Sequence, residues 1–94
     1  MNRLELVACI AERDALRYTP AGIPIVAVKL QHESEQSEAG MQRQVFLDIS
    51  AIAAGTIAGR LNGAELGKPY RFSGFLARKN RNSKSLVLHI VDFD

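Results

Sequence analysis

The chain has 94 residues, of which 47% are hydrophobic and 23% are charged, and its formal net charge at pH 7 is +2. This length allows one small domain, and the ordinary balance of apolar and charged residues indicates a folded globular protein. No apolar run approaches the ~20 residues of a membrane helix and no signal-peptide pattern opens the chain, so we expect a soluble, cytoplasmic protein without membrane contact.

Two strands are predicted in the first third of the chain. Leu4–Ala11 places Leu, Leu, Ala and Ile on one face at a period of two residues. Cys9 lies on the other face, and as the only cysteine it can form no intrachain disulfide, so we interpret it as a small buried hydrophobe. A turn at Tyr18–Gly22, with proline second and glycine fourth in its four-residue core, leads into a second alternating strand, Ile23–His32.

The third predicted strand carries an aromatic ring on its polar face. Glu33–Met41 is acidic and lacks periodicity, which predicts a surface loop, and the strand Arg43–Ile49 follows it. Val, Leu and Ile alternate on one face of this strand, so Phe46 falls on the face that meets water. An exposed ring beside Arg43 would provide a stacking surface for a nucleic-acid base and a charge for its phosphate. The alternative is that Phe46 packs under a loop or against a second subunit.

A helical segment and a basic hairpin complete the chain. Ser50 is predicted to cap a short or frayed helix through Ala51–Ala54, and Asn62-Gly63 ends the helical region. The strands Tyr70–Ala77 and Leu86–Val91 then enclose a loop that holds four cations and no acid, namely Arg78, Lys79, Arg81 and Lys84. Such a loop is either an ordinary solvated connection or a phosphate-binding finger.

These elements predict an all-β fold. Five strands, with a short helical or irregular segment between the third and fourth, form the arrangement of an OB-fold barrel, here a single domain over residues 1–94. In that fold, strands two and three and the loops between strands one and two and between four and five bind oligonucleotides or oligosaccharides. Phe46 and the basic loop fall in these places, which favours a nucleic-acid ligand.

No catalytic constellation is visible. The sequence contains no glycine-rich phosphate loop, no Gly-x-Ser-x-Gly turn and no helical histidine pair for a metal. Its two histidines, His32 and His89, have no acidic or thiol cluster near them in the sequence, so we expect no metal site. The sequence therefore predicts a protein that is not an enzyme and that uses no cofactor and no small-molecule substrate.

Several segments resemble bacterial single-stranded-DNA-binding proteins, and most of all the branch that acts in the replication-restart primosome. The resemblance covers nearly the whole chain and is carried by Asn2-Arg3-Leu4, Arg17–Pro24, Glu65–Phe75, Glu38-Ala39-Gly40, Arg43-Gln44 and Val87-Leu88-His89. It implies an OB-fold homodimer that binds single-stranded DNA and works with the PriA helicase and other primosome proteins. The first strand, through Arg3–Val7, is the expected dimer contact.

The resemblance also implies a set of DNA-binding residues. The family's basic loop corresponds to Arg78, Lys79, Arg81 and Lys84, its aromatic residue on strand three to Phe46, and the preceding arginine to Arg43. Met41 stands at a position where an aromatic residue is expected, and the chain has no tryptophan. These differences motivate a second hypothesis, a protein-interaction adaptor with weak or no nucleic-acid binding, whose basic loop docks an acidic protein segment. Binding to single-stranded RNA stays open, because recognition through backbone and stacking tolerates both sugars.

Overall fold

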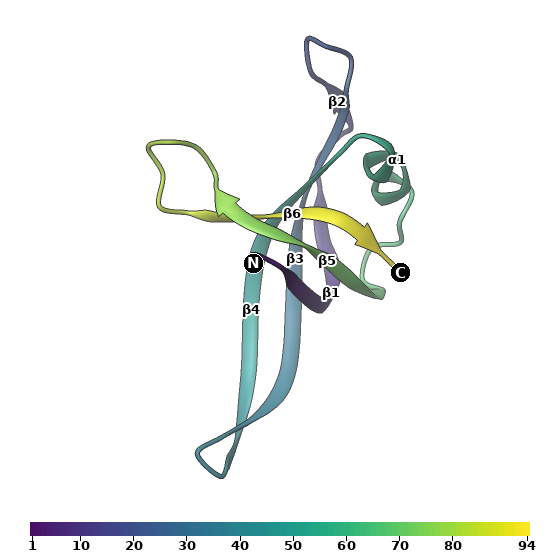
Figure 1. Cartoon of the computed structure of the whole chain (residues 1–94). Coiled ribbons are helices and arrows are strands. Elements are labelled where there is room, and N and C mark those ends of the chain that lie inside the picture. The colour runs from purple at the N-terminus through teal and green to yellow at the C-terminus, as the bar shows by residue number, and fades with distance from the viewer.

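The computed structural model describes residues 1–94 and is built of six strands and one helix (Figure 1). Their order is β1 (Leu4–Arg13), β2 (Arg17–Tyr18), β3 (Pro24–Glu38), β4 (Met41–Ala54), α1 (Thr56–Asn62), β5 (Pro69–Arg78) and β6 (Leu86–Phe93). The five long strands run in the order β1-β5-β6-β4-β3, and β3 pairs again with β1, which closes the barrel. The predicted all-β OB-fold is confirmed, with the two-residue β2 as an unpredicted addition.

The core follows the alternation that the sequence predicts for β1 and β3. Ala8 and Ile10 of β1 are buried, as are Val26, Val28 and Leu30 of β3. The largest fully buried side chains come from five different elements and are Phe72, Ile10, Leu30, Leu61, Leu88 and Val26. Each fully buried side chain of this size contributes about 1.5–3 kcal/mol through its removal from water, so these positions hold the barrel together.

The predicted loop at Glu33–Met41 is wrong. β3 continues to Glu38 and β4 begins at Met41, so that the two strands form a long hairpin whose turn is Ala39-Gly40. Both turn residues have positive φ, 53° and 75°, which is the backbone of the tight two-residue turns that suit twisted hairpins. The outer part of this hairpin extends away from the barrel as an arm (Figure 1), and the molecule measures 51 × 32 × 22 Å as a result.

The predicted short helix between the third and fourth long strands is present, but its predicted start at Ala51–Ala54 is wrong. These residues extend β4 and pair with β3, and Ala51 and Ala53 point into the core. The helix starts later, at Thr56, after Gly55 has turned the chain with a φ of 83°. It ends at Asn62-Gly63 as predicted, and it buries Ala58 and Leu61 against the barrel. No helix of this protein has the length and apolar character that crossing a membrane requires.

The last strand runs two residues beyond its predicted end at Val91. Phe93 is buried, and the backbone of Asp94 exchanges two hydrogen bonds with that of Arg71, at 2.8 and 3.1 Å. Arg60 of α1 donates to the Asp92 carboxylate at 2.9 Å and to the Phe93 carbonyl oxygen at 2.6 Å, and its guanidinium lies over the Phe93 ring. The helix is thereby tied to the end of β6.

Candidate nucleic-acid interface

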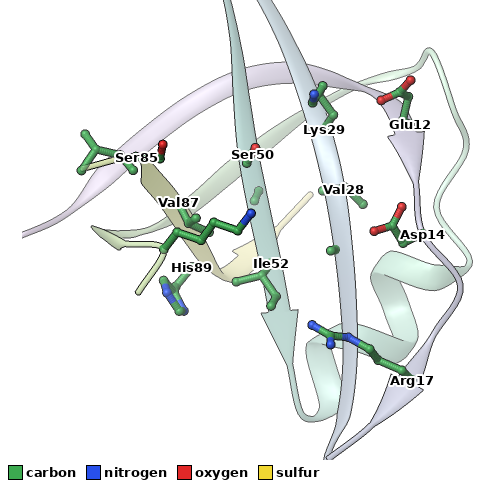
Figure 2. A pocket seen from close by; sticks show the side chains of 14 residues that line it. Glu12, Asp14, Arg17, Val28, Lys29, Ser50, Ile52, Ser85, Val87 and His89 are labelled. Carbon is green, nitrogen blue, oxygen red and sulfur yellow. The ribbon is translucent and has the colours of Figure 1, made fainter. Parts of the chain in front are cut away.

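A hollow of about 630 Å³ lies on the outer surface of the barrel, between the β1–β3 connection and the β5–β6 loop. Figure 2 shows the side chains of the β1–β3 connection on one side of it and those of β6 and the adjoining loop on the other. The side chains that form it are Glu12, Asp14, Arg17, Ala27, Lys29, Ser50, Ile52, Lys79, Ser85, Leu86, Val87 and His89, with Val28 and Ala51 at its base. These are the regions in which an OB-fold binds its ligands.

Three cations in the hollow have no ion-pair partner within the chain. The chain forms three salt bridges, Arg3–Glu5, Arg43–Glu38 and Arg60–Asp92, and none involves Arg17, Lys29 or Lys79. Since no protein carboxylate neutralises these cations, they are available to a negatively charged ligand.

Two acids, Glu12 and Asp14, also line the hollow, and Figure 2 places them on the side of the β1–β3 connection, away from His89. The negative charge therefore lies along one margin, while the margin of β6 and its adjoining loop carries Lys79, Ser85, two aliphatic side chains and the His89 ring. The two carboxyl groups whose pKa departs from its ordinary value, Glu5 and Asp92, lie elsewhere. In each of them, a hydrogen bond from an arginine, Arg3 or Arg60, lowers the pKa.

The four predicted loop cations, Arg78, Lys79, Arg81 and Lys84, are all exposed. Lys79 is the one that lines the hollow. The loop folds back through hydrogen bonds of its own, among them Lys79 N–H to the Ser85 carbonyl oxygen at 2.9 Å. The other three cations extend the positive surface beyond the hollow along the hairpin.

Phe46 is on the water-exposed face of β4, as predicted, with 69% of its surface accessible. It shares this face with Ser50 and Ile52 of the hollow, because side chains of one strand alternate between its faces. At a rise of ~3.3 Å per residue, the four steps from Phe46 to Ser50 span ~13 Å. The ring therefore lies on the same face as the hollow, on the arm rather than inside it.

Arg43 is not beside Phe46, contrary to expectation. Arg43 and Met41 are an odd number of residues from Phe46, so they point to the opposite face of β4. Both are exposed near the end of the arm, where Arg43 pairs with Glu38 at 3.4 Å. The structure thus separates the predicted site residues into the loop cations, the ring on the outer face of the arm, and a pair on its inner face.

Lys79 is the one residue of the hollow that the sequence predicts as a site residue, and the unpredicted ones include Arg17, Lys29, Ile52 and His89. Lys29 could have been found, because it falls on the polar face of a predicted strand that leads to the ligand-binding region. Ile52 was hidden by its assignment to a helix. His89 pairs across strands with Ile52, in a parallel pairing between β4 and β6 that no local pattern reveals.

Residues 2–92 match a family described as another single-strand binding protein family. Replication restart protein PriB of Bordetella pertussis is 46% identical over 90 residues, which cover 96% of this chain and 84% of that protein. PriB of Nitrosomonas europaea is 40% identical over 91 residues, with 97% of this chain and 84% of that protein covered.

The structure of PriB from Ralstonia solanacearum superposes with a TM-score of 0.92 at 44% sequence identity, covering 100% of this chain and 96% of that one. This fold similarity accompanies a sequence match over 96% of this chain and 84% of the Bordetella relative. The chain therefore belongs to the single-strand binding protein family, in the branch formed by the PriB replication restart proteins.

Proposed function

We propose that this protein binds single-stranded DNA, catalyses no reaction on it, and acts as an accessory protein in the restart of replication in the cytoplasm. The observation that carries this proposal is the open hollow in which Arg17, Lys29 and Lys79 stand beside apolar side chains without ion-pair partners. Cations attract the phosphates of a DNA strand, and apolar surfaces accept its unstacked bases. The relatives named replication restart protein PriB support the same role.

The proposed contact surface continues from the hollow onto two projections. On the β5–β6 hairpin, the exposed cations Arg78, Lys79, Arg81 and Lys84 would follow the phosphates. On the arm, Phe46 would stack with a base, while Arg43 and Met41 would meet the strand only where it passes around the end of the arm. A single strand fits this surface better than a duplex, because its bases are free to lie on side chains.

We further propose that the protein is a homodimer joined through β1. The first half of β1 pairs with β5 on one side, whereas its pairing with β3 begins only at Cys9. The His32 ring hydrogen-bonds the Val7 carbonyl oxygen at 2.6 Å, so the open strand edge on the other side is Leu4–Leu6, which is a template for pairing with another chain. Val7, half exposed next to this stretch, adds an apolar contact.

The PriA helicase and other primosome proteins are the proposed protein partners. The support for them is the membership of this chain in the branch of replication restart proteins. A pull-down of PriA by the tagged protein, repeated with nuclease present, tests the contact independently of DNA. Loss of PriA on nuclease treatment would show that DNA alone bridges the two proteins.

The test of the main function is a titration of fluorescently labelled oligo-dT at several salt concentrations. Neutralising about four phosphates per protomer predicts a slope of log K against log salt near −3, because single strands release ~0.7 counterions per phosphate. A slope near zero, or no binding at low salt, would contradict the proposal. The same titration with oligo-U decides between DNA and RNA.

A protein-interaction adaptor is the second candidate, and the surroundings of Phe46 favour it. Glu33 is the direct cross-strand neighbour of this ring, and Asp48 follows two residues along the same face. Carboxylates so placed repel a phosphate backbone, whereas they suit a protein segment. In a competition experiment, a partner that excess oligonucleotide fails to displace, together with no DNA binding by the protein alone, would favour the adaptor.

A further inference from the structure

Four side chains form a row across the outer surface of the barrel, at right angles to the strands. Phe75 of β5 is paired with His89 of β6, His89 with Ile52 of β4, and Ile52 with Ala27 of β3. Neighbouring strands lie about 4.8 Å apart, so the row spans three such steps. Its last three members line the hollow.

The two aromatic members of this row stack on each other. The ring centroids of Phe75 and His89 are 4.8 Å apart and their planes differ by 3°. Phe75 is 40% exposed although it is a large apolar side chain, and His89 is half buried. Figure 2 shows His89 and Arg17 on opposite sides of the hollow with Ile52 between them. The imidazole therefore forms a wall of the hollow and is supported from behind by a phenyl ring.

The backbone beneath this pair is closely packed. Gly74 precedes Phe75, and a Cβ at Gly74 would collide with the carbonyl oxygen of His89. Only glycine allows β5 and β6 to approach so closely here, and this approach fixes the two rings relative to each other. A flat surface that is already ordered costs little further entropy when a ligand stacks on it.

We propose that the Phe75–His89 pair is a base-stacking platform within the hollow, with His89 as the residue that contacts the base. Lys79 and Arg17 stand in the same hollow, so a base on His89 would have its phosphates near cations. This proposal rests on the proposed binding of single-stranded DNA and names the surface that receives a base. Phe46 would then serve a second base farther along the strand, outside the hollow.

A base-stacking residue is distinguished from a phosphate contact by DNA that lacks bases. The experiment compares wild-type protein with His89→Leu and His89→Phe, using oligo-dT and an abasic oligonucleotide of equal length at several salt concentrations. His89→Leu introduces an apolar side chain of similar size without the flat ring, whereas His89→Phe keeps a flat ring. The melting temperature of each variant reports any effect on the fold.

Stacking on one base predicts that His89→Leu weakens binding to oligo-dT about tenfold. Its salt slope stays unchanged, and its binding to the abasic strand equals that of the wild type. His89→Phe retains wild-type affinity for oligo-dT.

The proposal is overturned if His89→Leu binds oligo-dT as the wild type does, since the pair would then only stabilise the sheet. An equal loss on both oligonucleotides would also overturn it, because that result indicates a phosphate contact. Failure of the wild-type protein to bind oligo-dT at all would reject the proposed function and this platform together.

Discussion

Lys79 connects the two parts of the proposed interface, because it belongs to the cationic β5–β6 hairpin and also lines the hollow. Lys79 is exposed and takes part in no salt bridge. The same is true of Arg81 and Lys84 on the same loop. A side chain in this situation contributes little to folding, since no interaction within the chain is lost on its removal. Its charge should therefore act on the ligand alone.

The triple substitution Lys79→Ala, Arg81→Ala and Lys84→Ala should weaken oligo-dT binding strongly and leave the melting temperature nearly unchanged. If each cation neutralises one phosphate, the salt slope becomes shallower by about 2 per protomer. Lys68→Ala, which removes an exposed cation outside the hollow, is the control for a general charge effect. Equal slopes for the triple variant and the wild type would remove the loop from the interface.

The acids of the hollow should oppose binding. Glu12 and Asp14 are exposed at its margin and would face the phosphates that Lys29 and Arg17 attract. Glu12→Gln combined with Asp14→Asn is therefore expected to increase oligo-dT affinity several-fold at low salt, with a smaller effect at high salt as screening grows. Glu65→Gln removes an exposed acid elsewhere on the surface and should change affinity little. An unchanged affinity in the double variant would mean that the strand avoids the β1–β3 margin.

At the scale of single elements, substitution of two glycines by alanine should change the stability of the fold in opposite directions. Gly74 on β5 lies against the His89 backbone, so Gly74→Ala should destabilise the protein by about 2–4 kcal/mol or prevent folding. Gly59 lies inside α1 with no atom within 4 Å of an added Cβ, so Gly59→Ala should stabilise the fold by about 0.5–1 kcal/mol. Urea denaturation of both variants measures these differences. A stable Gly74→Ala protein would mean that β5 and β6 can separate without cost.

The contact between α1 and β6 should give the protein a small acid-dependent stability. Hydrogen bonds from Arg60 and from the Phe93 N–H lower the pKa of Asp92 in the folded protein. The contribution is therefore complete above the usual pKa of aspartate, about 3.9, and is lost as the pH falls through the lowered folded value. Its size is modest because the pair is exposed to solvent.

Urea denaturation between pH 3 and 6 tests this contact. Asp92→Asn should reduce the acid-dependent loss of stability relative to the wild type. Asp48→Asn, which alters an exposed carboxylate with no salt-bridge partner, should leave that dependence as it is. If the two variants behave alike, the Arg60 contact does not stabilise the fold in solution.

At the scale of the whole molecule, the proposed homodimer depends on the open edge of β1. Val7→Asp places a charge next to this edge and should shift the protein from dimer to monomer in sedimentation experiments, because burying an unpaired charge is costly. Val91→Asp introduces the same charge at an exposed valine of β6 and should leave the dimer intact. A wild-type protein that sediments as a monomer at tens of micromolar would exclude this assembly.

The parts of the fold that could be predicted from sequence are those in which one face of a strand is buried. Val26, Val28 and Leu30 alternate with polar residues because β3 lies on the core there, and this pattern located the strand. The same strand beyond His32 is largely exposed on both faces, so no alternation of apolar side chains appears and the sequence predicts a loop there. Ala51–Ala54 consists of small apolar residues that suit a helix as well as a buried strand.

Only part of the candidate site could be predicted from the sequence, for a related reason. The charge of the loop and the exposure of Phe46 could be predicted, because charge clusters and strand faces are local properties. The hollow itself is assembled from β1, β3, β4, β6 and two connections, and the parallel pairing of Ser50–Ile52 with Val87–His89 sets its floor. Pairing between segments so far apart in the chain is decided by closure of the barrel, and neither segment has a sequence pattern that predicts it.

That parallel pairing between β4 and β6 has three residue pairs, the fewest between any two of the five long strands, and it is therefore the shortest seam of the barrel. Seams with few hydrogen bonds open at a lower free energy than the rest of a fold, so amide exchange should be fastest there among the barrel strands. A polynucleotide bound as we propose, across His89 and Ile52, would bridge both edges of the seam and would bind only when the seam is closed. Occupancy will consequently slow exchange on β4 and β6 and raise the temperature at which the barrel melts.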